Sequence, residues 1–177
     1  MRAFVAVEVP SGAGDPGGVA TPAPDHRTLR FLGEIDEPTA EALLRSLGPA
    51  VARVPAFEFV LEGVGAFPSA DRPRVVWRGV SRGEAELRAL ARVVRETVDA
   101  SGAVRDPAPF VPHVTLFRVR SPRDRERAAR LLAPGASLPP PTPVGVDSVQ
   151  FVESQLTRTG AIHRTRARFH LEGTPPS

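Results

Sequence analysis

Two stretches of the sequence share one tetrapeptide frame, His26-Arg27-Thr28-Leu29 and His113-Val114-Thr115-Leu116. The chain has only four histidines, so two matches to His-x-Thr-Leu are far more than chance supplies. In a strand, residues two apart point to the same face, so each stretch presents an imidazole beside a hydroxyl while its leucine points to the core. The repeated frame predicts two similar strands, one in each half of the chain.

These side chains suggest chemistry on a phosphate. One neutral imidazole can accept a proton while a protonated one donates, and threonine hydroxyls can hold non-bridging phosphate oxygens. The arrangement suits in-line attack on phosphorus without a metal ion. The alternative is that each histidine is a satisfied polar residue on a strand edge, and the matched pair favours the catalytic interpretation.

Outside the two stretches, hydrophobic spacing predicts alternating strands and helices. Asp36 has the chemistry of an N-cap, Ser81-x-x-Glu84 is interpreted as a capping box, and Gly48-Pro49 is expected to kink or end the first helix. The expected strands are 3–9, 26–32, 57–61, 74–80, 113–119, 144–153 and 161–171, and the expected helices are 36–51, 81–102 and 121–132.

This order predicts an α+β protein with antiparallel sheets. The 177 residues fit a single domain, residues 1–177, in which two similar lobes face each other. Residues 10–25 are mainly proline, glycine and alanine, so we expect a flexible loop there.

Composition limits the setting of the protein. Its basic residues are 23 arginines with no lysine, and the net charge of +3 permits an RNA partner without requiring one. The absence of cysteine suits a reducing compartment, and no apolar run has the length of a membrane span. We therefore expect a soluble cytoplasmic protein with no membrane partner, whose oligomeric state the sequence does not indicate.

Several stretches together resemble the 2H phosphoesterases, most closely the bacterial and archaeal RNA 2′,3′-cyclic phosphodiesterases, historically called 2′-5′ RNA ligases. The resemblance covers nearly the whole chain and includes both histidine motifs. The stretches that carry it are residues 1–7, 26–33, 65–68, 74–77, 113–118, 151–154 and 159–161.

The resemblance implies a two-lobed, pseudo-two-fold fold with helices on the outside, and a set of site residues. His26 and His113 are expected to be catalytic, with His113 as base and His26 as acid, while Thr28 and Thr115 bind the phosphate. Arg118 is expected to bind phosphate too. Strict alternation would place Arg118 on the opposite face from His113, so the strand must end or bulge near Phe117.

The implied reaction is the hydrolysis of a 2′,3′-cyclic phosphate to a 2′-phosphate, on RNA or an oligonucleotide. The resemblance implies no metal and no cofactor. Two alternatives stay open: a non-catalytic RNA- or nucleotide-binding protein on the same fold, and an enzyme for another cyclic phosphate or a 2′-5′ linkage.

The sequence also departs from the family's pattern. The segment 10–25 is too short for the helix and strand that usually precede the first histidine, so we expect a shortened first lobe. Arg27 stands where the family has an apolar residue, and we expect it to face solvent beside an uncovered Leu29 and Phe31. His163 repeats His-x-Thr without the leucine, so neither it nor His170 is predicted to be catalytic.

Overall fold

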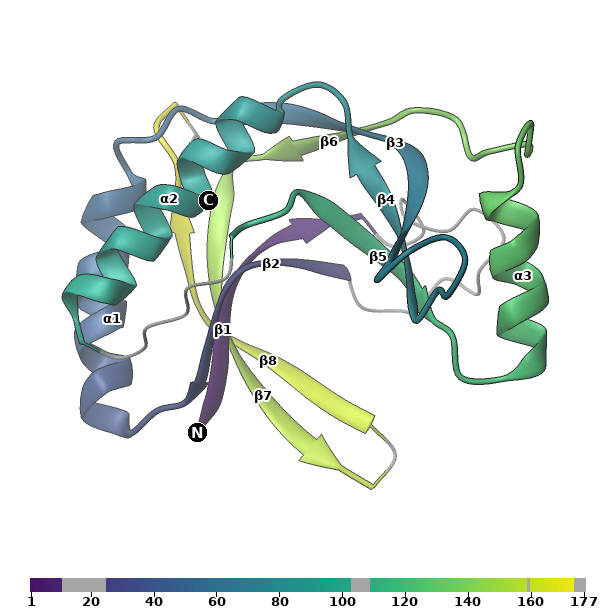
Figure 1. Cartoon of the computed structure of the whole chain (residues 1–177). Coiled ribbons are helices and arrows are strands. Elements are labelled where there is room, and N and C mark those ends of the chain that lie inside the picture. Colours follow the sequence, from purple (N-terminus) through teal and green to yellow (C-terminus); the bar gives the residue numbers. More distant parts are fainter. Residues whose placement is uncertain (11–24, 103–108, 159, 174–177) are drawn as a thin grey trace.

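The computed structural model describes residues 1–10, 25–102, 109–158 and 160–173, without the side chains of Asp25 and His26 (Figure 1). The loop expected at 10–25 lies mostly outside the described residues, and Asp25 already belongs to a strand. The elements are β1 (Arg2–Val9), β2 (Asp25–Glu34), α1 (Glu37–Val51), β3 (Phe57–Phe67), β4 (Val75–Val80), α2 (Glu84–Ala100), β5 (His113–Arg118), α3 (Pro122–Leu132), β6 (Thr142–Val146), β7 (Ser148–Thr157) and β8 (Gly160–His170).

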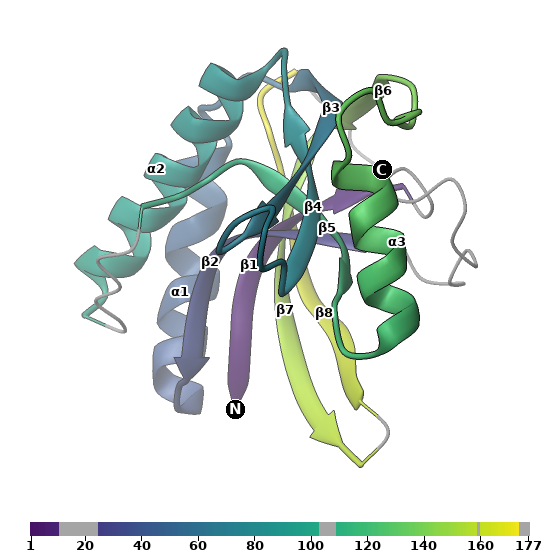
Figure 2. The same cartoon turned by 45° about the vertical axis from the view of Figure 1, so that its right-hand side comes forward.

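The described strands form two antiparallel sheets of four strands each, in the orders β2-β1-β7-β8 and β5-β4-β3-β6. The two motif strands, β2 and β5, hold equivalent positions, each at the edge of its sheet. The helices α1 and α2 lie side by side, and α3 lies on the opposite side of the molecule (Figures 1 and 2). This arrangement confirms the expected α+β class with two antiparallel sheets and outer helices.

The helix α1 begins as the sequence predicts and ends slightly later. Asp36 is its N-cap and accepts a hydrogen bond of 2.9 Å from the backbone N–H of Thr39. Pro49 does not end the helix at Gly48, because it lies in the last turn, where its missing N–H leaves only one carbonyl without an intrahelical donor. The helix therefore continues to Val51.

The capping box expected at Ser81 and Glu84 is wrong. The N-cap of α2 is Gly83, with φ of 73°, and no side chain caps this end. The backbone before it is bonded to β3 instead, since Val60 exchanges hydrogen bonds with Ser81 and Arg82. A capping box does form at α3, where Ser121 and Asp124 bond each other's backbone.

The single strand expected at 144–153 is two strands in different sheets. β6 pairs with β3 in the second sheet, whereas β7 pairs with β1 and β8 in the first. The chain crosses between the sheets at Asp147, with buried residues on both sides of the crossing. Sequence alternation runs through this point, so it does not reveal the change of sheet.

The first sheet is covered, contrary to expectation. α2 packs against β2 and β3, and α1 packs against β8. Leu29 is therefore only 6% exposed and belongs to a continuous core that includes residues of both sheets and both helices. Phe31 is exposed as expected, at 59%. Among the described residues, no helix has both the length and the apolar composition needed to cross a membrane.

Candidate active site

The second motif lies on β5, and a bulge in that strand brings its polar residues to one face. His113 pairs with Gly79 and Thr115 with Trp77, but the next pair is Phe117 with Val76. Leu116 is thus an extra residue, which shifts the alternation by one. By this pairing Arg118, opposite Val75, falls on the same face of β5 as Thr115 and His113. The bulge expected near Phe117 is therefore present.

The first motif has the same design. In the β1–β2 register, His26 is opposite Glu8 and Thr28 is opposite Ala6, and a shift follows at Leu29. The side chain of His26 is outside the described part of the chain, so the structure gives its backbone position alone. Both motif leucines therefore occupy bulges, and Phe31 takes the place on β2 that Arg118 takes on β5.

His113 is half-buried and held from two sides. Its ring contacts Phe67 edge to face, with 4.9 Å between ring centroids, and lies 5.9 Å from the Trp77 ring. Its Nδ1 lies 2.7 Å from the carbonyl oxygen of Val111. Because a carbonyl only accepts, Nδ1 carries the proton, and the neutral ring keeps its lone pair on Nε2.

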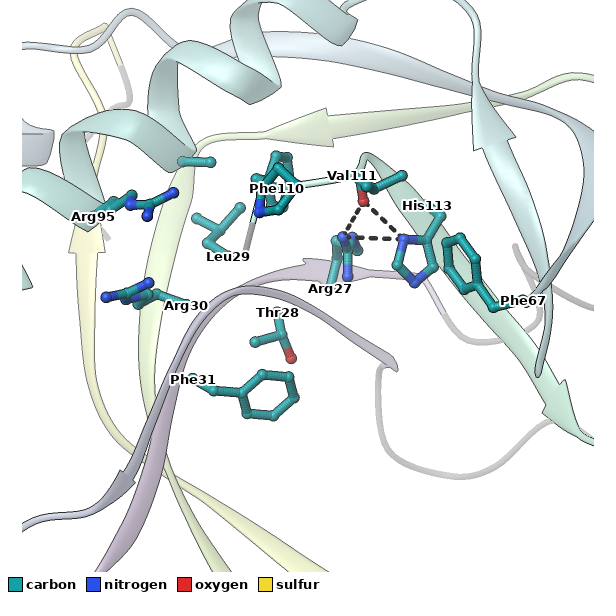
Figure 3. Close-up of a pocket in the computed structure, with 12 residues that line it drawn as sticks. Arg27, Thr28, Leu29, Arg30, Phe31, Phe67, Arg95, Phe110, Val111 and His113 are labelled. Carbon is teal, nitrogen blue, oxygen red and sulfur yellow. Dashed lines mark hydrogen bonds between the residues drawn. The ribbon is translucent and has the colours of Figure 1, made fainter. Parts of the chain in front are cut away.

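Arg27 does not face solvent, which corrects the expectation from the sequence. Its guanidinium crosses from the first sheet, donates to the Val111 carbonyl at 2.6 Å, and lies 3.4 Å from Nδ1 of His113 (Figure 3). It also stacks 5.0 Å from the centre of the Phe110 ring. These partners exist because the segment before β5 passes over the β2 edge, which the sequence spacing does not show.

The site favours a neutral His113. Burial, and then the Arg27 charge, lower the pKa of His113, while its bond to the Val111 carbonyl acts in the opposite direction. Burial also lowers the pKa of Arg27 to about 10, so this group stays charged at neutral pH. The imidazole can therefore accept a proton at Nε2.

A cavity of about 280 Å³ joins the two motif strands. Arg27 and Thr28 line it from β2, and His113 lines it from β5. In Figure 3, Arg27 lies beside His113, whereas Thr28 projects from the other side of β2, toward Phe31. Thr115 and Arg118 are exposed on β5 and do not line this cavity. Among the described residues, no group of three histidine, cysteine or acidic side chains gathers where a metal ion could bind.

Sequence reasoning missed the aromatic residues beside His113. Trp77 occupies space that a Cβ on Gly65 would fill, with its Cε2 atom only 2.9 Å from that position. A glycine inside a strand often marks such a close approach, so Gly65 was the available signal. No comparable signal marks Phe67, which the pairing of β3 with β4 places opposite Val75.

Comparison with known proteins agrees with this geometry. The profile of the family described as the 2′-5′ RNA ligase superfamily matches residues 13–158. An RNA 2′,3′-cyclic phosphodiesterase of Aeropyrum pernix is 39% identical over 140 residues, which cover 79% of this chain and 78% of that protein. The one of Aquifex aeolicus is 34% identical over 152 residues, covering 84% and 78%.

Two solved structures have the same fold. Escherichia coli LigT complexed with 3′-AMP has a TM-score of 0.71 and 27% identity, covering 97% of this chain and 98% of that one. The protein TT0787 of Thermus thermophilus has a TM-score of 0.67 and 31% identity, covering 98% and 99%. The chain belongs to the 2′-5′ RNA ligase superfamily, and thus to the 2H phosphoesterases.

Proposed function

We propose that this protein hydrolyses the 2′,3′-cyclic phosphate at an RNA end to a 2′-phosphate. The observation that carries the proposal is the matched register of the two motif strands, in which His26 and Thr28 on β2 hold the positions that His113 and Thr115 hold on β5. The curated relatives from A. pernix and A. aeolicus are both named RNA 2′,3′-cyclic phosphodiesterase. The absence of cysteine suits a cytoplasmic setting, which we propose as well.

The site residues divide the reaction between them. His113 removes a proton from water through Nε2, and the water oxygen forms a bond to phosphorus. The bond from phosphorus to the ribose 3′ oxygen breaks in line, and His26 donates the proton that this oxygen needs. The 2′ ester stays intact, so the product carries a 2′-phosphate.

The remaining polar residues stabilise the charge on the phosphate. Thr28 and Thr115 donate hydroxyl hydrogen bonds to non-bridging oxygens. Arg118 adds a charged donor, because the strand register places it on the same face of β5 as Thr115. Two imidazoles supply both proton transfers, so the proposed mechanism includes no metal ion and no nucleotide cofactor.

The test is an assay of the purified protein with 2′,3′-cyclic mononucleotides and with 2′-5′ linked dinucleotides, with the products separated by chromatography. The proposal predicts conversion of the cyclic substrates to 2′-monophosphates. Binding without turnover would instead support a non-catalytic nucleotide-binding protein. Cleavage confined to the 2′-5′ linkage would move the same chemistry to another substrate.

A further inference from the structure

Two segments beside the second sheet concentrate positive charge. Residues 70–74, between β3 and β4, and residues 118–130, from the end of β5 through most of α3, hold eight arginines and three acidic residues, a net +5. The whole chain carries +3, so all other residues together carry −2. A general excess of arginine does not explain this distribution, because the rest of the chain holds fifteen arginines without a positive balance.

The fold brings the two segments together. The N–H of Val119 donates to the carbonyl of Arg74 at 2.9 Å, and Val75 pairs with Arg118. Arg72, Arg74 and Arg125 line one cavity of about 430 Å³. Asp71 is the single acidic residue among those that line it.

Most arginines of these two segments lack the ion pairs that several arginines elsewhere form. On the helices α1 and α2 and on β8, several arginines form ion pairs with neighbouring carboxylates, such as Arg88 with Glu84 at 2.7 Å and Arg168 with Glu8 at 2.9 Å. Within the described residues, no ion pair involves the side chains of Arg72, Arg74, Arg118, Arg120, Arg123, Arg125 and Arg130. Their charge is therefore available to an outside anion.

The position of these residues indicates the anion. We propose that Arg72, Arg74, Arg120, Arg123 and Arg125, here called the arginine surface, bind the phosphodiester backbone of the RNA whose cyclic end occupies the active site. Arg120, Arg123 and Arg125 follow Arg118, the residue assigned to the reacting phosphate, and Arg74 is joined to this segment by the hydrogen bond from Val119. The helix α3, which carries Arg123 and Arg125, lies on the side of the molecule away from α1 and α2 (Figure 2). Guanidinium groups bind phosphate oxygens in pairs, and a backbone presents several phosphates in succession. This inference rests on the proposed function, and it makes an RNA strand the preferred substrate over a free cyclic nucleotide.

The experiment compares two substrates and two triple variants. Arg72, Arg74 and Arg125 are changed together to glutamine, and the control changes the exposed Arg2, Arg53 and Arg92 in the same way. Steady-state kinetics are measured with a cyclic mononucleotide and with an oligonucleotide of about ten nucleotides that ends in a cyclic phosphate, a length within the usual site size for single strands.

For the oligonucleotide, the first triple variant should raise KM about tenfold, as expected from three weak exposed charge pairs. The slope of log(kcat/KM) against log salt concentration should become shallower by about 2, since each single-strand phosphate contact contributes about 0.7. The constants for the mononucleotide, and both sets of constants for the control variant, should stay within about twofold of the parent.

An unchanged oligonucleotide KM and salt slope in the first triple variant would overturn the proposal and leave the surface to another partner, such as an acidic protein. Equal losses with both substrates would also overturn it, because they would place these residues in the active site. If the parent hydrolyses neither substrate, the proposed function fails. In that case fluorescence anisotropy with the same oligonucleotide still decides whether the surface binds RNA.

Discussion

Arg27 and Val114 hold the same position in the two motifs but have different surroundings. Val114 is 4% exposed and lies in the core. Arg27 instead crosses to the other sheet and shares the Val111 carbonyl with His113. Its charge opposes protonation of the imidazole, so the first motif influences the proposed base of the second.

Replacing Arg27 with leucine should therefore raise the pKa of His113. Leucine keeps the site covered, so burial still lowers this pKa while the contribution of the guanidinium charge is lost. A base works when it is unprotonated, so the acid limb of the profile of log(kcat/KM) against pH should move to higher pH. Titration of the His113 ring by NMR should show the same direction without depending on turnover.

Arg95→Leu is the matched control, since Arg95 lines the same cavity but no hydrogen bond between it and His113 is observed. Its acid limb should stay where the parent has it. A shift in the control as large as in Arg27→Leu, or no shift in either, would mean that Arg27 does not act on His113.

Arg118 and Arg120 test the assignment of the phosphate ligand. The bulge at Leu116 places Arg118 on the same face of β5 as His113, while Arg120 lies beyond the end of this strand. Arg118→Ala should lower kcat/KM for a cyclic mononucleotide by roughly 10- to 100-fold, because a charge-assisted phosphate contact contributes about 1.5–3 kcal/mol. Arg120→Ala should have little effect on this small substrate, and equal small effects would make Arg118 a surface residue.

At the scale of the elements, the start of α2 depends on Gly83. Its φ of 73° is left-handed, and an added Cβ would lie 2.7 Å from Cα and 2.8 Å from Cβ of Phe59. Gly83→Ala should therefore destabilise the protein by about 2–4 kcal/mol in urea unfolding, through backbone strain together with the clash. Gly102 has a similar φ of 72° but no atom within 4 Å of the added Cβ.

Gly102→Ala is thus the control, and it should cost about 1 kcal/mol, which is the conformational part alone. Equal losses in the two variants would show that the contact with β3 does not fix the start of α2.

Local patterns predicted most elements, and contacts between distant segments account for the errors. The helix α2 was predicted because its buried residues, among them Leu87, Leu90 and Val94, follow helical spacing, which is a local property. The false capping box at Ser81 could not be recognised, because its backbone bonds to Val60 twenty-one positions earlier. The crossing at Asp147 was missed for the same kind of reason, since strand pairing determines it.

The candidate site was predictable to a similar extent. Its motif residues follow from the repeated frame, and the bulge needed by Arg118 was expected from the resemblance. The position of Arg27 and the cover over Leu29 were not, since both depend on α2 and on the segment before β5 packing against β2.

For the whole molecule, the two sheets act as one support for the site. The core cluster contains Val5 from the first sheet, Phe59 from the second and Leu90 from α2. This shared packing holds β2 and β5 beside the same cavity, so the distance between the motif strands depends on the complete fold.

Activity should survive removal of divalent ions. The proposed mechanism assigns both proton transfers to histidines, and among the described residues no cluster of side chains suits a metal. Turnover of a cyclic mononucleotide in excess EDTA should equal turnover without it. Loss of activity that returns with one divalent ion would contradict the proposed mechanism.

The most direct test of the account is the rate of 2′,3′-cyclic nucleotide hydrolysis by His26→Ala and His113→Ala, each compared with the parent and with His170→Ala. General acid and base residues usually contribute about 10²- to 10⁴-fold to a rate. The account predicts a loss of this size in both motif variants, a near-parent rate in His170→Ala, and unchanged folding by circular dichroism in all three. Near-parent hydrolysis by either folded motif variant would contradict the two-histidine mechanism.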